Sequence, residues 1–170
     1  MLKKYFTEEE YQKLKESNDL LYKTLELVIK LFDDKTDKGG IPYLNHLVKV
    51  YAGVVEYDEK IIALLHDVVE DTDVTFDDLK DLGYPISIID ALNCLTKRKG
   101  EYYPDYIGRI IDSDNIHAMN VKLADLTHNI DIKRIKEPSV NDYERVTKRY
   151  IPAYNKISSK LEELKKSKNW

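Results

Sequence analysis

Four side chains able to bind a metal or move a proton follow an apolar run in the middle of the chain. Positions 61–72 read IIALLHDVVEDT, and the polar members of interest are His66, Asp67, Glu70 and Asp71. Burying unpaired charges at this density costs several kcal/mol per ion, and a divalent cation is the simplest compensation. On one continuous helix, His66 lies one turn before Glu70, and Asp67 lies one turn before Asp71. The spacing therefore predicts a metal-binding helix, with a solvated acidic helix end as the alternative.

Two other segments each carry one more residue of metal-ligand type. His46 lies in the sequence YLNHLV, and Asp125 ends the sequence VKLAD. With His66 and Asp67 they form a set of two imidazoles and two carboxylates, which suits Mn²⁺, Fe²⁺ or Zn²⁺ with open positions better than a closed structural zinc site. A lone His or Asp on an apolar helix usually bonds protein groups, so the prediction requires all four to meet. Asn129, one turn after Asp125, is expected to face the same cavity.

The elements that position these residues are all predicted to be helices. Capping and periodicity signals predict a first helix opening at 7, helices at about 18–32, 42–56, 61–72, 75–83, 85–95, 105–111 and 121–130, and a long last helix from 139. Pro152 should kink or break the last helix. No run shows the alternation of a strand between turn signals. We therefore expect an all-α, single-domain helical bundle.

Length and charge narrow the class of protein. The chain has 170 residues, for which one domain over 1–170 is the default, and a formal net charge of -4. That charge argues against broad binding to nucleic acid or anionic membranes. Cys94 is the only cysteine, so neither a disulfide framework nor a cysteine metal site is expected. The first residues, MLKKYFTEEE, contain no apolar export segment, and we expect a cytoplasmic protein. The oligomeric state is not indicated.

His46, the His66-Asp67 pair and Asp125 resemble the H…HD…D signature of the HD superfamily of metal-dependent phosphohydrolases. A fuller pattern consists of KGGIPY at 38–43, HDVVEDT at 66–72 and VKLAD at 121–125. It is similar to the guanosine polyphosphate (ppGpp, alarmone) hydrolases, which include the hydrolase half of RelA/SpoT enzymes and the small alarmone hydrolases. The similarity covers about 38–135 and implies an HD-type helical fold.

The resemblance also implies a reaction and a distribution of roles. It assigns Mn²⁺ to a ligand set formed by His46, His66, Asp67 and Asp125. It assigns Glu70 and Asp71 to the attacking water and to proton transfer, and Asn129 to the nucleotide sugar. We therefore expect a Mn²⁺-dependent enzyme that removes the 3′-pyrophosphate of ppGpp or pppGpp, giving GDP or GTP and pyrophosphate. Its partner is a small nucleotide.

Two departures from the family pattern concern the nucleotide. Asp37 stands where the alarmone hydrolases carry an arginine against the guanine, and Leu126 replaces the arginine of their ADRLHN sequence. One alternative is therefore an HD phosphohydrolase acting on another small nucleotide, such as a deoxynucleoside monophosphate. The other is a non-catalytic nucleotide-binding HD module, against which the retained Glu70 and Asp71 argue.

Further substrate contacts are predicted from motif position or charge. The predicted set is Lys38, Tyr43, Arg98, Arg109 and Asn129. Lys38 and Tyr43 belong to the KGGIPY motif, whereas the two arginines are candidate phosphate-binding cations. The alternative for each cation is a solvated surface charge, and for Tyr43 it is packing beside the His46 helix. Of the remaining histidines, His128 is expected to pack near the metal set and His117 to be solvated.

Overall fold

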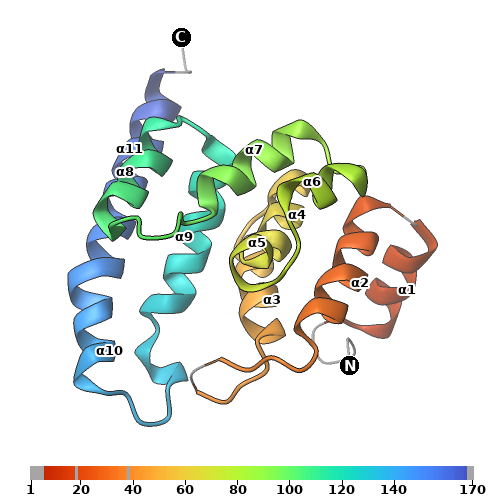
Figure 1. Cartoon of the computed structure of the whole chain (residues 1–170), viewed down its shortest axis with the longest axis horizontal. Helices are drawn as coiled ribbons and strands as arrows, with labels where there is room; N and C mark the ends of the chain where they lie inside the picture. Colours follow the sequence, from red (N-terminus) through yellow and green to blue (C-terminus); the bar gives the residue numbers. More distant parts are fainter. Residues whose placement is uncertain (1–5, 18, 38, 168–170) are drawn as a thin grey trace.

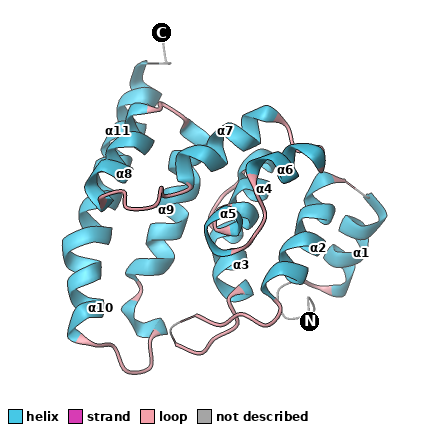
Figure 2. Ribbon diagram, viewed as in Figure 1, coloured by secondary structure: helices cyan, strands magenta, loops and turns pink. Residues whose placement is uncertain are grey.

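The computed structural model describes residues 6–17, 19–37 and 39–167, and over these ranges the chain is a set of helices joined by loops (Figure 1). Thr36 and Pro42 form a single antiparallel bridge, and no strand occurs among the described residues, as Figure 2 shows. The predicted all-α fold is confirmed. Lys38, a predicted substrate contact, lies outside the described residues. Within them, no helix is both long and apolar enough to cross a membrane.

The helices follow one another in the order that the sequence predicts. They are α1 (Glu8–Ser17), α2 (Leu20–Phe32), α3 (Leu44–Ala52), α4 (Tyr57–Leu65), α5 (Val68–Asp71), α6 (Phe76–Asp81), α7 (Ile86–Leu95), α8 (Tyr103–Asp112), α9 (Ile116–Ile130), α10 (Val140–Arg145) and α11 (Ile151–Ser167). Two short segments of other helical type are the 3-10 turn η2 (Ile132–Arg134) and the π-helical turn η3 (Val146–Tyr150).

Capping boxes begin three helices at the predicted positions. Each pairs a hydroxyl side chain with an acidic residue three positions later, and the pairs are Thr7 with Glu10, Thr75 with Asp78 and Ser139 with Asp142. Reciprocal bonds of this kind satisfy backbone N–H groups that have no partner inside the helix. Gly83 follows α6 with a φ of +88°, which glycine adopts without the strain that a side chain would bring.

Helix α4 lies at the centre of the core. Its apolar side chains are at most 1% exposed; they are Ile61, Ile62, Leu64 and Leu65. The helix contacts α2, α3, α7 and α9, and Figure 1 shows it surrounded by these elements. Since burying one such side chain contributes about 1.5–3 kcal/mol, packing holds α4 rigidly. The rigid helix in turn fixes the position of the residues at its C-terminal end, His66 and Asp67.

The prediction of one continuous helix over 61–72 is wrong. Helix α4 ends at Leu65, His66 and Asp67 form a turn, and α5 begins at Val68. Asp67 has φ of -103° and ψ of 0°, in the bridge region of the backbone map. His66 closes the turn, because its Nδ1 lies 2.6 Å from the carbonyl oxygen of Ala63. The turn changes the direction of the chain before Glu70 and Asp71. Their positions relative to His66 and Asp67 therefore do not follow from the spacing of one continuous helix.

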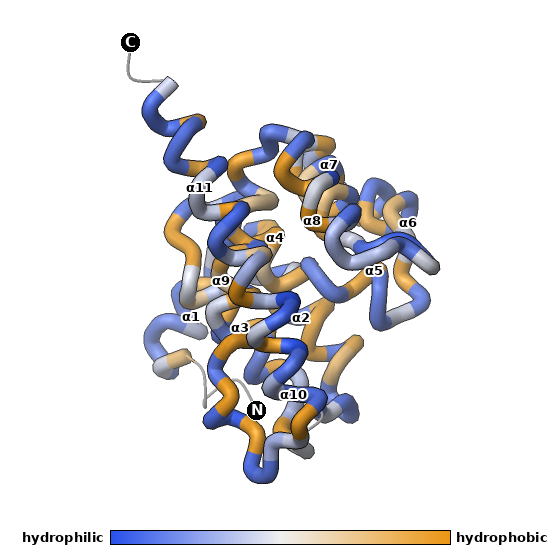
Figure 3. The backbone as a smooth tube through the Cα atoms, turned by 90° about the vertical axis from the view of Figure 1, so that its left-hand side faces the viewer, coloured by the Kyte–Doolittle hydropathy of each residue, from blue (hydrophilic) through white to orange (hydrophobic). Residues whose placement is uncertain are grey.

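The last helical stretch changes its hydrogen bonding without a loop. Helix α10 passes through the π turn η3 into α11, and the N–H of Ile151 donates to the carbonyl of Val146, five residues back. Pro152 has no N–H to donate, so the disturbance predicted at this proline takes the form of one widened turn instead of a break. The C-terminal end of α11 reads EELKKS at 162–167, and Figure 3 shows it as largely hydrophilic.

Candidate metal centre and active-site cavity

Four predicted metal ligands, drawn from distant parts of the chain, meet at one point. His46 comes from α3, His66 and Asp67 from the turn after α4, and Asp125 from α9. The Nε2 atom of His46 lies 3.2 Å from Nε2 of His66, 3.4 Å from Oδ2 of Asp67 and 3.3 Å from Oδ1 of Asp125. Atoms that share one ion at about 2.1 Å lie roughly 3–3.5 Å apart. The separations therefore fit a site for one transition-metal ion.

The charges of this set also fit a cation. Burial lowers the pKa of His46, but Asp125 and Asp67 outweigh burial and raise that pKa to about 9. Burial raises the pKa of Asp125, but Lys122 and His46 outweigh it and hold the pKa well below the usual range. Burial raises the pKa of Asp67 as well, but His66 and His46 outweigh it and hold that pKa well below the usual range. Both carboxylates are thus ionised at neutral pH, and a proton on His46 balances part of their charge. A divalent cation can take over that role as the proton leaves.

Asp125 is oriented by two neighbours on its own helix. Lys122 Nζ donates to Oδ2 of Asp125 at 2.8 Å, and Asn129 Nδ2 donates to Oδ1 at 2.5 Å. Asn129 therefore faces the same cavity, as its spacing from Asp125 predicted. The roles predicted from the sequence do not include Lys122, although it lies in the VKLAD motif. Its position three residues before Asp125 was the signal for a direct contact.

Glu70 and Asp71, the predicted catalytic carboxylates, lie beside the metal set. Glu70 Oε1 accepts a hydrogen bond of 2.5 Å from the backbone N–H of Lys97. Burial raises the pKa of Glu70 and also that of Asp71, in each case with a further contribution from the charge of Asp67. A carboxylate whose pKa is raised toward neutrality is a better proton acceptor than a fully solvated one. This environment suits a group that orients or deprotonates water.

Tyr43 contacts the acidic side of the site directly. Its hydroxyl donates to Oδ2 of Asp67 at 2.6 Å and to Oδ2 of Asp71 at 3.1 Å. Its ring stacks on Phe32 with centroids 5.1 Å apart. Both interpretations of Tyr43 from the sequence thus describe part of its environment, because the ring packs on the core and the hydroxyl reaches the site.

A cavity of about 370 Å³ opens over the metal set. Its walls include Glu70 and Asn129 together with groups that sequence reasoning did not single out as site residues, namely Tyr103, Tyr106, Arg134, Arg145 and Tyr150. The hydroxyl of Tyr103 is buried, without a hydrogen-bond partner in the described part of the chain. The positive charges of Lys97, Lys122 and Arg145 make this cavity suited to a phosphorylated ligand.

Arg145 and Tyr150 reach the cavity together because of the π turn. Residues five apart on an α-helix point in directions about 140° apart. In a π-helix the i and i+5 positions are hydrogen-bonded neighbours on one face. The widened turn η3 begins directly after Arg145 and ends at Tyr150, and both side chains line the cavity. The α-helical period assumed for the last helix would not have brought them together.

The two remaining predicted substrate contacts lie elsewhere. Arg109 donates to both carboxylate oxygens of Glu101 and to the carbonyls that end α7, those of Asn93, Cys94 and Thr96. Its guanidinium is thus engaged with protein groups, and it does not line the cavity over the metal set. Arg98 is exposed and is not among the lining residues of that cavity either. In both cases charge alone suggested the prediction, and neither side chain is brought to the site.

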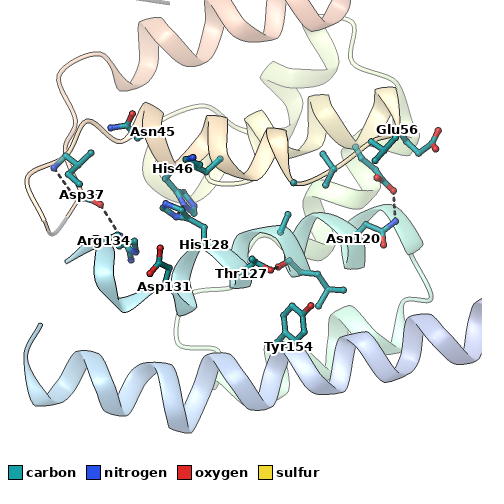
Figure 4. Close-up of a pocket in the computed structure, with 18 residues that line it drawn as sticks. Asp37, Asn45, His46, Glu56, Asn120, Thr127, His128, Asp131, Arg134 and Tyr154 are labelled. Atoms are coloured by element: carbon teal, nitrogen blue, oxygen red, sulfur yellow. Dashed lines mark hydrogen bonds and ion pairs between the residues drawn. The ribbon is translucent and has the colours of Figure 1, made fainter. Parts of the chain in front are cut away.

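A larger cavity of about 910 Å³ lies on the other side of His46 (Figure 4). Among its lining residues is His128, whose Nδ1 is 2.8 Å from Nδ1 of His46, so this histidine supports the metal set as expected. His117 is exposed as expected, and its Nδ1 also lies 3.1 Å from Oε1 of the buried Glu59. The two cavities share Asp37, His46 and Arg134.

Comparison of the sequence with curated proteins finds similar chains among enzymes of (p)ppGpp metabolism. The chain is 27% identical over 143 residues to the bifunctional (p)ppGpp synthase/hydrolase SpoT of Escherichia coli, covering 76% of this chain and 20% of SpoT. It is 29% identical over 135 residues to the guanosine-3′,5′-bis(diphosphate) 3′-pyrophosphohydrolase of Haemophilus influenzae, covering 72% of this chain and 20% of that one. The chain spans about a fifth of the length of these relatives. No family model matches it.

Comparison with solved structures finds a similar fold. A solved structure reported as a metazoan ortholog of SpoT that hydrolyses ppGpp superposes with a TM-score of 0.62 and 22% sequence identity, covering 88% of this chain and 95% of that one. The match confirms the fold. The similarity to SpoT-type proteins stated from the motifs is confirmed by the sequence comparison.

Proposed function

We propose that this protein is a metal-dependent hydrolase that removes the 3′-pyrophosphate of guanosine polyphosphates, giving GDP or GTP and pyrophosphate. The observation that carries the proposal is the meeting of His46, His66, Asp67 and Asp125, whose imidazole nitrogens lie 3.1–3.9 Å from the carboxylate oxygens, under a cavity with phosphate-binding groups. Similarity to enzymes named as ppGpp 3′-pyrophosphohydrolases supports the choice of substrate.

The metal ligands in this proposal are the same four residues, with Mn²⁺ as the ion. Two imidazoles and two carboxylates leave coordination positions open, as a hydrolytic centre requires. A bound divalent cation would lower the pKa of a coordinated water and withdraw charge from a phosphoryl oxygen. Tyr43 and Asn129 hold the two carboxylate ligands in place, through hydrogen bonds of 2.6 Å to Asp67 and 2.5 Å to Asp125.

Glu70 and Asp71 take the proton-transfer roles. The two carboxylates come three and four residues after Asp67 and have raised pKa values, and Glu70 also lines the cavity. One accepts a proton from the attacking water, and the other is placed to return a proton to the 3′-oxygen that leaves. Phosphoryl transfer needs positioning and charge stabilisation more than a protein nucleophile.

Cations and tyrosines of the cavity bind the phosphates. Lys97, Lys122 and Arg145 supply positive charge from three separate elements, and Tyr103 supplies an unpartnered hydroxyl. Lys122 also forms an ion pair with Asp125, so its charge offsets both that carboxylate and the bound phosphates. Lys38 retains a proposed substrate role from its motif, outside the described residues.

Incubation of the purified chain with ppGpp and Mn²⁺ tests the proposal. We expect GDP and pyrophosphate in equal amounts, and no reaction in the presence of a chelator. The same assay is run with a panel of other nucleotides, including deoxynucleoside monophosphates, because Asp37 replaces the family arginine near the base. Release of phosphate from one of these, with ppGpp left intact, would favour the second candidate function, an HD phosphohydrolase for a different nucleotide.

A further inference from the structure

Arg134 lies where the two large cavities adjoin. Its Nη1 donates to Oδ2 of Asp37 at 3.0 Å, and its Nη2 donates to Oδ1 of Asn129 at 3.3 Å. It lines both the cavity of about 370 Å³ over the metal set and the neighbouring cavity of about 910 Å³. Figure 4 shows Arg134 beside Asp131 and across from the loop that carries Asp37.

Asp37 anchors this arginine and is engaged at both of its carboxylate oxygens. Its Oδ1 accepts from the backbone N–H groups of Gly39 and Ile41, at 2.8 and 3.0 Å, and its Oδ2 accepts from Arg134. Asp37 therefore orders its own loop and neutralises the charge of the guanidinium. A neutralised guanidinium is a weak phosphate binder, but its N–H groups keep their direction and can still read a neutral partner.

The Nε–H donor of Arg134 is buried and has no hydrogen-bond partner among the residues that the structure describes. Buried donors in folded proteins are normally paired, so a missing partner points to a ligand or water that completes the contact. Arg134 lines two cavities, each large enough for such a partner.

The sizes of the two cavities favour the larger one as the place of the nucleobase. A volume of about 370 Å³ is near the low end for ligand pockets, and the phosphates at the metal set would occupy much of it. The adjoining cavity has apolar walls that include Ile41, Leu123 and Ala124. Under the proposed function, on which this step rests, a phosphate lies at the metal set and the base extends past Arg134 toward the larger cavity.

We propose that Arg134 is a specificity-determining residue that donates to the acceptor edge of the substrate's base and so selects a 6-oxopurine over adenine. Arginine offers only donors, and guanine presents two acceptors, O6 and N7, on one edge. Adenine presents an N6 donor in place of O6, which would face the guanidinium without an acceptor. Arg134, anchored by Asp37, thus supplies base recognition from η2 in a chain whose position 37 carries an aspartate instead of the family's arginine.

The test compares hydrolysis of guanosine and adenosine 3′-pyrophosphate-5′-diphosphates by the wild-type chain and by Arg134→Gln, with Mn²⁺. We expect the wild type to prefer guanosine. Arg134→Gln should lower kcat/KM for guanosine about 10- to 100-fold and change the adenosine value by less than about threefold. Lys133→Ala is the matched control, because it removes a positive charge from the exposed neighbouring residue and should leave the preference unchanged.

A purely structural role for Arg134 gives a different pattern. If the arginine acted only by holding Asn129, and through it Asp125, both substrates would lose activity equally and Mn²⁺ would bind more weakly. That result overturns the proposal, as does a wild type that shows no preference between the bases. Arg134→Lys keeps the charge but not the planar fork, and serves if Arg134→Gln fails to fold. It should also lose the guanosine preference.

Binding of GDP and ADP without divalent metal separates this inference from the proposed function. If GDP binds more tightly than ADP and the difference depends on Arg134, the inference stands even where no pyrophosphate is released. If the wild type hydrolyses ppGpp and Arg134→Gln keeps the full base preference, the inference fails and the proposed function stands.

Discussion

The Nδ1 atoms of His46 and His128 lie 2.8 Å apart, while Nε2 of His46 faces the other metal-set residues. In such a contact one ring donates and the other accepts. Burial and the charge of His46 lower the pKa of His128 to about 4, so His128 is neutral and can accept. His46 is then the donor through Nδ1, so the proton that a metal ion would displace is the one on Nε2, the atom that faces the other ligands.

Replacing His128 should therefore weaken metal binding without removing a ligand. Partners that orient a metal-binding histidine are typically worth about 10- to 100-fold in metal affinity. We expect His128→Ala to raise the Kd for Mn²⁺ by about that factor, measured by isothermal titration calorimetry. His117→Ala is the control, since His117 contacts Glu59 away from the metal set. An unchanged Kd in His128→Ala would show that the contact between the rings does not orient His46.

Metal binding should also stabilise the fold. Since the four ligands come together only in the folded chain, an ion that binds them adds about 2.7 kcal/mol when its concentration is a hundred times Kd. We expect the Tm to rise with Mn²⁺ and to return to its starting value with a chelator. Asp125→Asn should abolish most of the rise, because it removes a charged ligand of the set. A rise of equal size in this variant would place the ion elsewhere.

Glu70 should control the acid limb of the pH profile. The proposed role requires the ionised form, and burial raises the pKa of Glu70 above its usual value of 4.5. Activity should therefore be full at pH values above this raised pKa and fall as the pH drops through it. Glu70→Gln should lower kcat about 10²- to 10⁴-fold with little change in the Kd for Mn²⁺, and it should flatten this limb. Steady-state rates between pH 5 and 8 make the comparison.

The sequence was sufficient for the fold and for the metal set because both depend on local patterns. Apolar periodicity and capping boxes predict the helices. The motifs predict that His46, His66, Asp67 and Asp125 form one group. Their meeting depends on tertiary packing of α3, α4 and α9, for which the motifs served as a guide.

The features that could not be predicted depend on breaks in regular helical geometry and on ion pairs between residues far apart in the sequence. The turn at Asp67 breaks the expected helix because His66 bonds the carbonyl of Ala63, and composition carries no sign of this. The pairing of Asp37 with Arg134 spans 97 positions, so each looked like an isolated charge. Reasoning from charge favoured Arg109 instead, whose partners are the carbonyls at the end of α7 and Glu101.

The Arg109–Glu101 pair should give a stability contribution that depends on pH. Hydrogen bonds from Arg109, which outweigh the effect of burial, lower the pKa of Glu101 from 4.5 to about 2. A lowered folded-state pKa stabilises the fold above the unfolded value and loses that contribution as the pH falls from about 4.5 toward 2. Because the pair is only partly shielded from solvent, we expect Glu101→Gln to cost about 1–2 kcal/mol at pH 7.

Urea unfolding of the wild type and of Glu101→Gln at pH 7 and pH 3.5 measures this contribution. The difference in free energy of unfolding should be full at pH 7 and smaller at pH 3.5, where the unfolded chain already holds the proton. Lys80 and Asp77 form an exposed pair within α6, so Asp77→Asn is a control expected to change stability by less than about 0.5 kcal/mol. A Glu101→Gln difference that does not shrink at low pH would mean that the charge of Glu101 contributes nothing. The loop between α7 and α8 would then be held by the bonds from Arg109 to backbone carbonyls alone.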